Sequence, residues 1–140
     1  GKFAEESLAR WLQGQNKTWF RLIASSLPIA HQEILEVLQT ADFALLPYQP
    51  NASTANCIPT KMYECLAMAI PMVVQKNALW EQVCQPHSAA VFIDFADSNI
   101  SKTWEVMQKT AFYPHGNAAE ALWESEQGKL LHQVNEVLGN

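Results

Sequence analysis

Apolar and polar positions along the chain alternate between the spacing of an amphipathic helix and the short continuous runs of a buried strand. Helical spacing predicts helices over residues 3–12, 29–39, 97–108 and 118–138. Apolar runs predict strands over residues 19–24, 43–47, 72–74 and 90–93. Helices that alternate with strands are typical of a layered α/β domain with a mainly parallel sheet, and the continuous run over 43–47 suits a strand covered on both faces.

Residues 56–74 carry the most information, because a polar loop, a short helix and a buried strand follow one another there. Pro59 lacks an N–H group and has a preset backbone angle, so it suits the first turn of a helix. We therefore expect a helix that begins near Ile58 or Pro59 and that Pro71 ends after roughly three turns.

A polar loop over residues 51–55 follows the strand predicted over 43–47 and precedes this helix. Open α/β sheets bind their ligands at the carboxyl ends of the strands. The start of a helix adds unpaired N–H groups and the positive end of the helix dipole, which together favour an anion such as a phosphate. We therefore expect an anion-binding site from Asn56 to Thr60.

Lys61 and Glu64 lie three residues apart, on the same face of the predicted helix. A cation in the first turn opposes the helix dipole unless a phosphate or carboxylate lies near it. A carboxylate can accept two hydrogen bonds from neighbouring hydroxyl groups, such as those of a ribose. The alternative is a solvated ion pair that contributes a few tenths of a kcal/mol, and the helix geometry leaves both interpretations open.

A longer series of residues extends this pattern. A strand with an aspartate before it and a proline after it is followed by the motif Asn-x-x-Pro-x-Lys-x-aromatic-Glu-x-x-Ala and by further matches. The matching residues are Ala41-Asp42, Leu45-Leu46-Pro47, Asn56, Pro59, Lys61, Tyr63, Glu64, Ala67, Pro71, Leu79-Trp80, Val83, Val91-Phe92-Ile93-Asp94 and Leu122-Trp123-Glu124. In this order they resemble the carboxyl-terminal, donor-binding domain of GT-B-fold retaining glycosyltransferases of the large glycosyltransferase group 1 type, over roughly residues 30–138.

The resemblance implies a Rossmann-like layered domain, the carboxyl-terminal half of a GT-B enzyme, with a mainly parallel sheet flanked by helices. Residues 1–140 would form a single nucleotide-sugar-binding domain whose first strand precedes Gly1. A GT-B enzyme needs a second domain for its acceptor. We therefore expect a fragment of a two-domain enzyme that is inactive alone and has the amino-terminal acceptor domain as its partner.

The resemblance also implies an activity and a site. A hexosyltransferase-like enzyme of polysaccharide biosynthesis would transfer a sugar from a UDP- or GDP-linked donor to a glycan, lipid or other acceptor, with no cofactor. Glu64 would hold the donor ribose, the helix start would face the diphosphate, and Asn56 would meet the sugar with a neutral amide where many relatives have a carboxylate. The donor site implied by the resemblance, with no catalytic residue assigned, is Asn56, Cys57, Ile58, Pro59, Thr60, Lys61 and Glu64.

Two positions depart from the family pattern. Ala69 stands where the family usually has glycine before the hydrophobic-Pro pair, and Ala89 or Ala90 stands where another glycine is usual. At a backbone position with positive φ, the added methyl group would cost on the order of 1 kcal/mol. A catalytically degenerate domain kept for nucleotide-sugar binding or assembly is therefore an alternative, as is an unrelated ligand-binding α/β module.

Composition narrows the function classes. The 140 residues, 49% of them hydrophobic and 16% charged, suffice for one domain with a core. A net charge of −5 without a basic run argues against nucleic acid as a partner. Cys57, Cys65 and Cys84 lack CxxC spacing, which favours a reduced cytoplasmic protein over a zinc site. No stretch approaches the roughly 18 apolar residues of a membrane span, although the resemblance leaves open peripheral association of the full-length protein with the inner face of a membrane.

Several single residues are predicted to be structural. Trp80 and Trp123 share helical spacing with apolar neighbours, so we expect both to anchor the core. Asn77 is expected to cap a short helix. The histidines stand apart from one another without metal-like spacing, and we expect surface or capping roles for His31, His87, His115 and His132.

Overall fold

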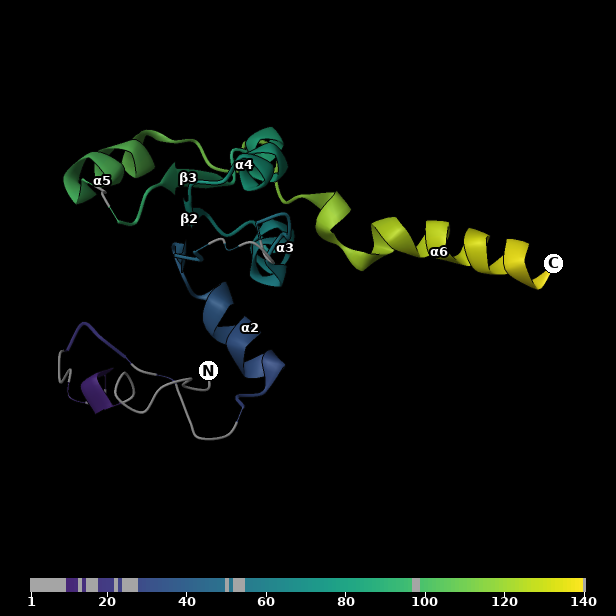
Figure 1. The fold of residues 1–140 in the computed structure, drawn as a ribbon, viewed down its shortest axis with the longest axis horizontal. Helices are drawn as coiled ribbons and strands as arrows, with labels where there is room; N and C mark the ends of the chain where they lie inside the picture. The colour runs from purple at the N-terminus through teal and green to yellow at the C-terminus, as the bar shows by residue number, and fades with distance from the viewer. Residues whose placement is uncertain are drawn as a thin grey trace. The chain divides into compact units, whose positions relative to one another are not determined.

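The computed structural model describes residues 10–12, 14, 18–21, 23, 28–49, 51, 55–96 and 99–139. The chain divides into two compact units, Gly1–Val37 and Leu38–Asn140 (Figure 1). In the first unit, residues 10–12 are helical, as predicted for the end of a helix over 3–12, and the earlier residues of that helix lie outside the described part.

The strand predicted over 19–24 is wrong for the residues that the structure describes there. Trp19 lies in a turn, and Phe20, Arg21 and Ile23 have no strand pairing. The helix predicted over 29–39 is confirmed as α2 (His31–Gln39), which begins after Pro28 and ends as predicted. None of its residues is buried, and Leu38, with which the second unit begins, is partly buried against the core of that unit.

Three strands of the second unit form a parallel sheet in the order β1-β2-β3. They are β1 (Ala44–Leu46), β2 (Met72–Gln75) and β3 (Ala90–Ile93), each within or close to its predicted range. Helix α3 (Thr60–Ala67) connects β1 to β2, and α4 (Ala78–Cys84) with the 3₁₀ turn η1 (Gln85–His87) connects β2 to β3 (Figure 1). The predicted α/β class with a parallel sheet is therefore confirmed, and it is compatible with a Rossmann-like domain.

The two faces of the sheet are packed differently. Residues from β1 and β2 join α3 and α4 in the larger core cluster, which contains Ala44, Leu46, Met62, Cys65, Leu66, Ile70, Met72, Val74, Trp80, Cys84 and Ala89. On the opposite face, Val73 and Val91 pack against Met107 of α5 (Ile100–Lys109). Asn99 caps α5 by accepting a hydrogen bond from the Lys102 N–H at 3.1 Å, and residues 97 and 98, where the predicted helix began, lie outside the described part.

The prediction that both faces of the strand over 43–47 are covered is wrong. Leu45, in the middle of β1, remains 65% exposed, while Ala44 and Leu46 are buried. Helix α5 packs on the central and last strands of the sheet, so it does not shield the outer strand. Leu45 consequently lines an apolar groove of about 390 Å³ between the sheet and α5.

Helix α3 begins at Thr60, with Pro59 as its N-cap, and ends at Ala67, so it has eight residues and is shorter than predicted. The Ile70 N–H donates to the Cys65 carbonyl at 2.9 Å and the Ala69 N–H to the Leu66 carbonyl at 3.3 Å. These two bonds are those of a Schellman motif, which needs a left-handed residue after the helix. Ala69 takes that conformation, with φ of 53°, and ends the helix before Pro71.

At the second position that departs from the glycosyltransferase pattern, the left-handed backbone conformation lies one residue earlier than expected. Neither Ala89 nor Ala90 has positive φ; the left-handed residue is Ser88, with φ of 49°, which follows the turn η1. The Ala89 N–H then returns to the Cys84 carbonyl at 3.1 Å, and Ala89 is fully buried. Ser88, and neither alanine, therefore has the strained left-handed backbone that was expected at Ala89 or Ala90.

The segment after α5 closes the carboxyl end of α3. The Tyr113 hydroxyl donates to the Ile70 carbonyl at 3.0 Å and lies 3.3 Å from the Cys65 carbonyl. The Asn117 amide donates to the Ala67 carbonyl at 2.9 Å. Asn117 thus satisfies a carbonyl group that the helix end leaves without an intrahelical partner, and Tyr113 binds the turn that follows the helix.

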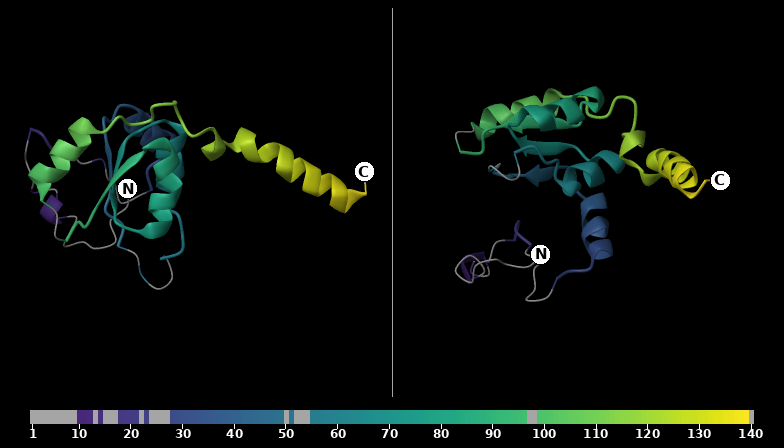
Figure 2. Two further views of the ribbon diagram at one scale, coloured as in Figure 1. Left: turned by 90° about the horizontal axis from the view of Figure 1, so that it is seen from above. Right: turned by 45° about the vertical axis from the view of Figure 1, so that its right-hand side comes forward.

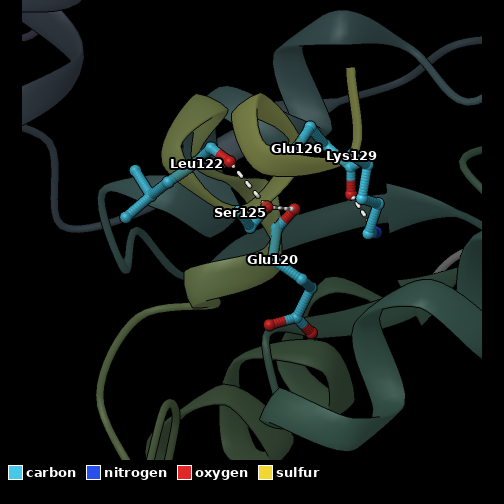
Figure 3. A network of polar contacts seen from close by, with 5 residues as sticks. All are labelled: Glu120, Leu122, Ser125, Glu126 and Lys129. Carbon is cyan, nitrogen blue, oxygen red and sulfur yellow. Dashed lines mark hydrogen bonds and ion pairs between the residues drawn. The ribbon is translucent and has the colours of Figure 1, made fainter. Parts of the chain in front are cut away.

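The last predicted helix, over 118–138, is interrupted. A 3₁₀ turn, η2 (Ala119–Ala121), precedes Leu122, whose extended backbone separates it from α6 (Trp123–Leu138). Figure 3 shows the Ser125 hydroxyl at this junction, which donates to the Leu122 carbonyl at 2.7 Å and lies 3.1 Å from the Glu120 carbonyl.

The core role predicted for Trp123 is wrong, because its side chain is 60% exposed. No residue of α6 is buried, and within the second unit the helix runs on from η2 away from the sheet (Figure 2). None of the helices in the described part of the chain is both long and apolar enough to cross a membrane.

Glycine at position 69 should stabilise the protein, because glycine adopts positive φ at no steric cost. We expect Ala69→Gly to raise the free energy of unfolding, measured by urea denaturation, by about 1 kcal/mol. Ala67→Gly, in the last turn of the same helix, is the matched control and should lower it by about 1 kcal/mol. Destabilisation at both positions would contradict the left-handed cap at Ala69.

Candidate functional site

A pocket of about 450 Å³ lies where the chain leaves β1 and enters α3. Its lining comes from the segment after β1, from the loop before α3 and from α4, and consists of Tyr48, Gln49, Asn51, Cys57, Pro59, Thr60 and Trp80. The pocket therefore occupies the carboxyl edge of the parallel sheet, as predicted for a ligand site in an open α/β fold.

The predicted site residues divide into three groups around this pocket. Cys57, Pro59 and Thr60 line it. Asn56 is exposed in the turn just before them, whereas Ile58 packs against the core and anchors the loop. Lys61 and Glu64, which follow on α3, do not line the pocket.

Lys61 and Glu64 form an ion pair on α3. Their side chains are 28% and 19% exposed, so the pair is only partly solvated. The predicted i,i+3 pair is therefore present, although it is less open to water than an ordinary surface pair. A carboxylate has about four acceptor positions, so an ion pair with one oxygen does not exhaust its capacity to accept hydrogen bonds from a ligand.

The start of α3 has no side-chain cap, because Pro59 carries no hydrogen-bonding side-chain group. The Met62 N–H donates back to the Pro59 carbonyl at 2.9 Å. By helix geometry, the N–H groups of Thr60 and Lys61 point out of the first turn, toward the loop. The positive end of the helix dipole thus lies at the residues that border the pocket.

Helix α4 holds the loop before α3 through two side chains. The Trp80 indole N–H donates to the Cys57 carbonyl at 2.8 Å, and the Asn77 amide donates to the Ala55 carbonyl at 3.3 Å. Trp80 is 1% exposed, so its predicted core role is confirmed. Its bond to the loop was not predicted, because the two residues are 23 positions apart.

Asn77 has two functions at once. Its side-chain oxygen accepts hydrogen bonds from the Leu79 N–H at 2.9 Å and the Trp80 N–H at 3.2 Å, which confirms the predicted helix cap. Its amide nitrogen makes the bond to Ala55. One side chain therefore fixes both the start of α4 and the loop at the pocket.

Gln75 supports the pocket from outside, because it contacts Gln49, and the sequence pattern did not single it out. It ends β2 and is 8% exposed. Its side-chain oxygen accepts hydrogen bonds from the Phe95 N–H at 3.1 Å and from the Gln49 amide at 3.4 Å. Gln75 thus joins the segments that follow β1 and β3, and a polar residue that ends an apolar strand was its only signal in the sequence.

The cysteines do not form a reactive cluster in the described part of the chain. Burial raises the pKa of the Cys65 thiol to about 11 and that of the Cys84 thiol to about 12, so both stay protonated at neutral pH. Cys57 is exposed beside the pocket. Among the described residues, no three His, Cys, Asp or Glu side chains are placed to hold a metal ion.

The histidines have surface positions, with one exception. His87 is only partly exposed, and its ring contacts the Glu120 carboxylate at 2.5 Å, so it joins η1 to η2. A hydrogen bond to its own backbone lowers the pKa of Glu120 most, and the hydrogen bond to His87 lowers it further. The surface or capping role predicted for His87 is therefore too simple.

The chain matches no protein-family model, no curated protein and no solved structure. A function is consequently inferred from the motif and from the geometry of the second unit. That geometry is an α/β unit with a three-stranded parallel sheet, helices on both faces and a pocket lined by uncharged side chains at the carboxyl edge.

The buried thiols predict that stability falls at alkaline pH. The pKa of Cys84 rises from 9.0 to about 12 on folding, so its stabilising effect is complete below pH 9 and is lost as pH rises toward 12. We expect the free energy of unfolding to fall less steeply between pH 9 and 11 in Cys84→Ala than in the unsubstituted protein, measured by urea denaturation. Cys57→Ala, which removes an exposed thiol, should retain the original slope; a Cys84→Ala slope equal to it would contradict the burial effect.

Proposed function

We propose that this chain is the donor-binding domain of a retaining, hexosyltransferase-like glycosyltransferase that uses a UDP- or GDP-linked sugar. The observation that carries the proposal is the position of the Lys61 and Glu64 pair on a helix whose uncapped start borders the pocket at the carboxyl edge of the sheet. The motif that resembles the glycosyltransferase family supplies the identity of the ligand.

The donor diphosphate would lie at the start of α3. The N–H groups of the first turn, the Thr60 hydroxyl and the Lys61 ammonium are chemically suited to bind phosphate oxygens. Lys61 lies where the helix dipole disfavours a cation, and Glu64 offsets this in the free protein. A bound diphosphate would compensate the same charge more fully, so phosphate binding is electrostatically favourable.

Glu64 would bind the ribose of the donor. Its carboxylate can accept hydrogen bonds from two adjacent hydroxyl groups while one oxygen remains paired with Lys61. The Glu64 side chain is 19% exposed, and charge-assisted hydrogen bonds are stronger when they are partly shielded from water.

The transferred sugar would enter the pocket. The loop over residues 48–60 contains no Asp, Glu, Lys, Arg or His, in a chain with 16% charged residues. Its polar side chains are amides and hydroxyls, which suit the hydroxyl groups of an uncharged sugar, and the pocket volume is within the usual range for small ligands. Gln49 and Asn51 are the amides that line the pocket, and Asn56 lies exposed in the turn next to it.

The reaction would break the bond between the anomeric carbon and the diphosphate oxygen and form a bond from that carbon to an acceptor hydroxyl oxygen on the same face of the sugar, and the hydroxyl proton would leave with the diphosphate. Negative charge develops on the departing diphosphate, and N–H groups and a cation at the start of α3 would stabilise it. The amino-terminal acceptor domain of the whole enzyme would bind the acceptor, which is a glycan, lipid or other hydroxyl compound. The isolated chain would therefore bind donor without transferring sugar.

Binding of UDP and GDP tests the donor site directly. We expect backbone amide shifts at residues 56–64 when either nucleotide is titrated at millimolar concentration, followed by NMR. Glu64→Ala should weaken the binding of the preferred nucleotide about tenfold to a hundredfold, because two charge-assisted hydrogen bonds to the ribose are lost.

The control uses a second i,i+3 pair of the chain. Glu126 and Lys129 pair at 2.6 Å on the exposed helix α6 (Figure 3), remote in sequence from the site. Glu126→Ala should leave nucleotide binding unchanged. Equal affinity in Glu64→Ala and the unsubstituted protein would refute the donor site, while nucleotide-sugar binding without transfer by the full-length enzyme would identify a degenerate domain.

The uncharged pocket wall predicts a preference among donor sugars. If UDP is the preferred nucleotide, UDP-glucose should bind about tenfold more tightly than UDP-glucuronate, because no cation of the loop over 48–60 would compensate the buried carboxylate. Isothermal titration measures both affinities, and equal values would contradict the assignment of the pocket to the sugar.

A further inference from the structure

The loop before α3 is fixed from outside by a helix that contributes little to the pocket itself. In this loop, taken as residues 55–59, the Ala55 carbonyl accepts a hydrogen bond from the Asn77 amide at 3.3 Å. The Cys57 carbonyl accepts one from the Trp80 indole N–H at 2.8 Å. Both donors belong to the first residues of α4 or to its cap. Two of the loop's peptide groups are thus oriented by one short stretch of the chain.

The orientation of these carbonyl groups determines the direction of the neighbouring N–H groups. In a trans peptide, the C=O and the following N–H point in opposite directions. The structure contains no cis peptide bond among the described residues. The carbonyl groups of Ala55 and Cys57 point to α4, so the N–H groups of Asn56 and Ile58 point away from it.

The donors of these bonds are rigidly held. Trp80 is 1% exposed within the core. Its ring packs edge to face against the Tyr48 ring, with the two ring centroids 6.5 Å apart. The Asn77 side chain is fixed by the two N–H groups that it caps. The loop is also anchored at its far end, where Ile58 packs on the core.

We propose that Trp80 and Asn77 are positioning residues that hold the loop over residues 55–59 in its ligand-binding conformation before the ligand arrives. The nature of the ligand, a nucleoside diphosphate, rests on the proposed function. The advantage is thermodynamic. If the loop had the bound conformation in only a fraction of the molecules, the apparent affinity would fall in proportion to that fraction, and a loop that is already in place avoids this loss. Neither residue needs to touch the diphosphate.

Asn77→Ser separates loop positioning from helix capping. A serine oxygen can still cap α4. Serine has no side-chain amide, however, so the hydrogen bond to the Ala55 carbonyl is lost. Trp80→Phe removes the indole N–H and keeps an aromatic ring in the core. The matched control is Asn99→Ser, because Asn99 caps α5 in the same way, through the Lys102 N–H, at a helix that does not hold the loop.

The experiment combines amide hydrogen exchange and backbone NMR relaxation of the free protein with titration of UDP and GDP. In Asn77→Ser and Trp80→Phe we expect lower backbone order parameters at Asn56 and Ile58, and a dissociation constant for the preferred nucleotide raised about fivefold to tenfold by the loss of one hydrogen bond. In Asn77→Ser the amides of Leu79 and Trp80 should keep their protection, and the urea midpoint should stay close to that of Asn99→Ser. A purely structural role would lower the midpoint without this selective effect on the loop.

The outcomes separate this inference from the donor-site proposal. Unchanged order parameters at Asn56 and Ile58 in Asn77→Ser would overturn the positioning role, even if UDP or GDP binds in a manner that depends on Glu64. If the unsubstituted protein binds neither nucleotide, the proposed function fails for these donors, and the order parameters of the free loop still decide the positioning role. If Trp80→Phe does not fold, Asn77→Ser alone carries the test.

Discussion

The burial of Trp80 is the interaction on which both the core and the site depend. The indole lies in the larger core cluster, on the face of the sheet covered by α3 and α4, and its N–H group reaches the loop that leads into α3. A buried indole nitrogen needs a hydrogen-bond partner, and the loop carbonyl provides one. The packing of the hydrophobic core therefore also determines where the polar loop lies.

Tertiary contacts also fix the other end of α3. The helix is only eight residues long, too short to be stable by itself, so it depends on tertiary contacts at both termini. Tyr113 and Asn117 satisfy carbonyl groups at its end, and burial raises the pKa of the Tyr113 hydroxyl, which remains a protonated donor. A helix fixed at both ends holds Lys61 and Glu64 in a constant position beside the pocket.

The arrangement has consequences for binding. Gln75 ties the segment after β1 to the segment after β3, while α4 holds the loop before α3. Side-chain hydrogen bonds of the protein itself therefore connect the segments at the carboxyl edge of the sheet. A site prepared in this way would lose little conformational entropy on binding, which would favour the proposed donor nucleotide.

Local features of the sequence determined much of this protein. The order of helices and strands, the exact strand Ala90–Ile93, the Asn77 cap and the Lys61–Glu64 pair all follow from residues within a few positions of one another. Only the tertiary structure decided the exposure of Leu45 and Trp123, because exposure depends on which distant element covers a side chain. The bonds of Trp80 and Gln75 to their loops likewise join residues about 20 or more positions apart, and no local periodicity encodes such pairs.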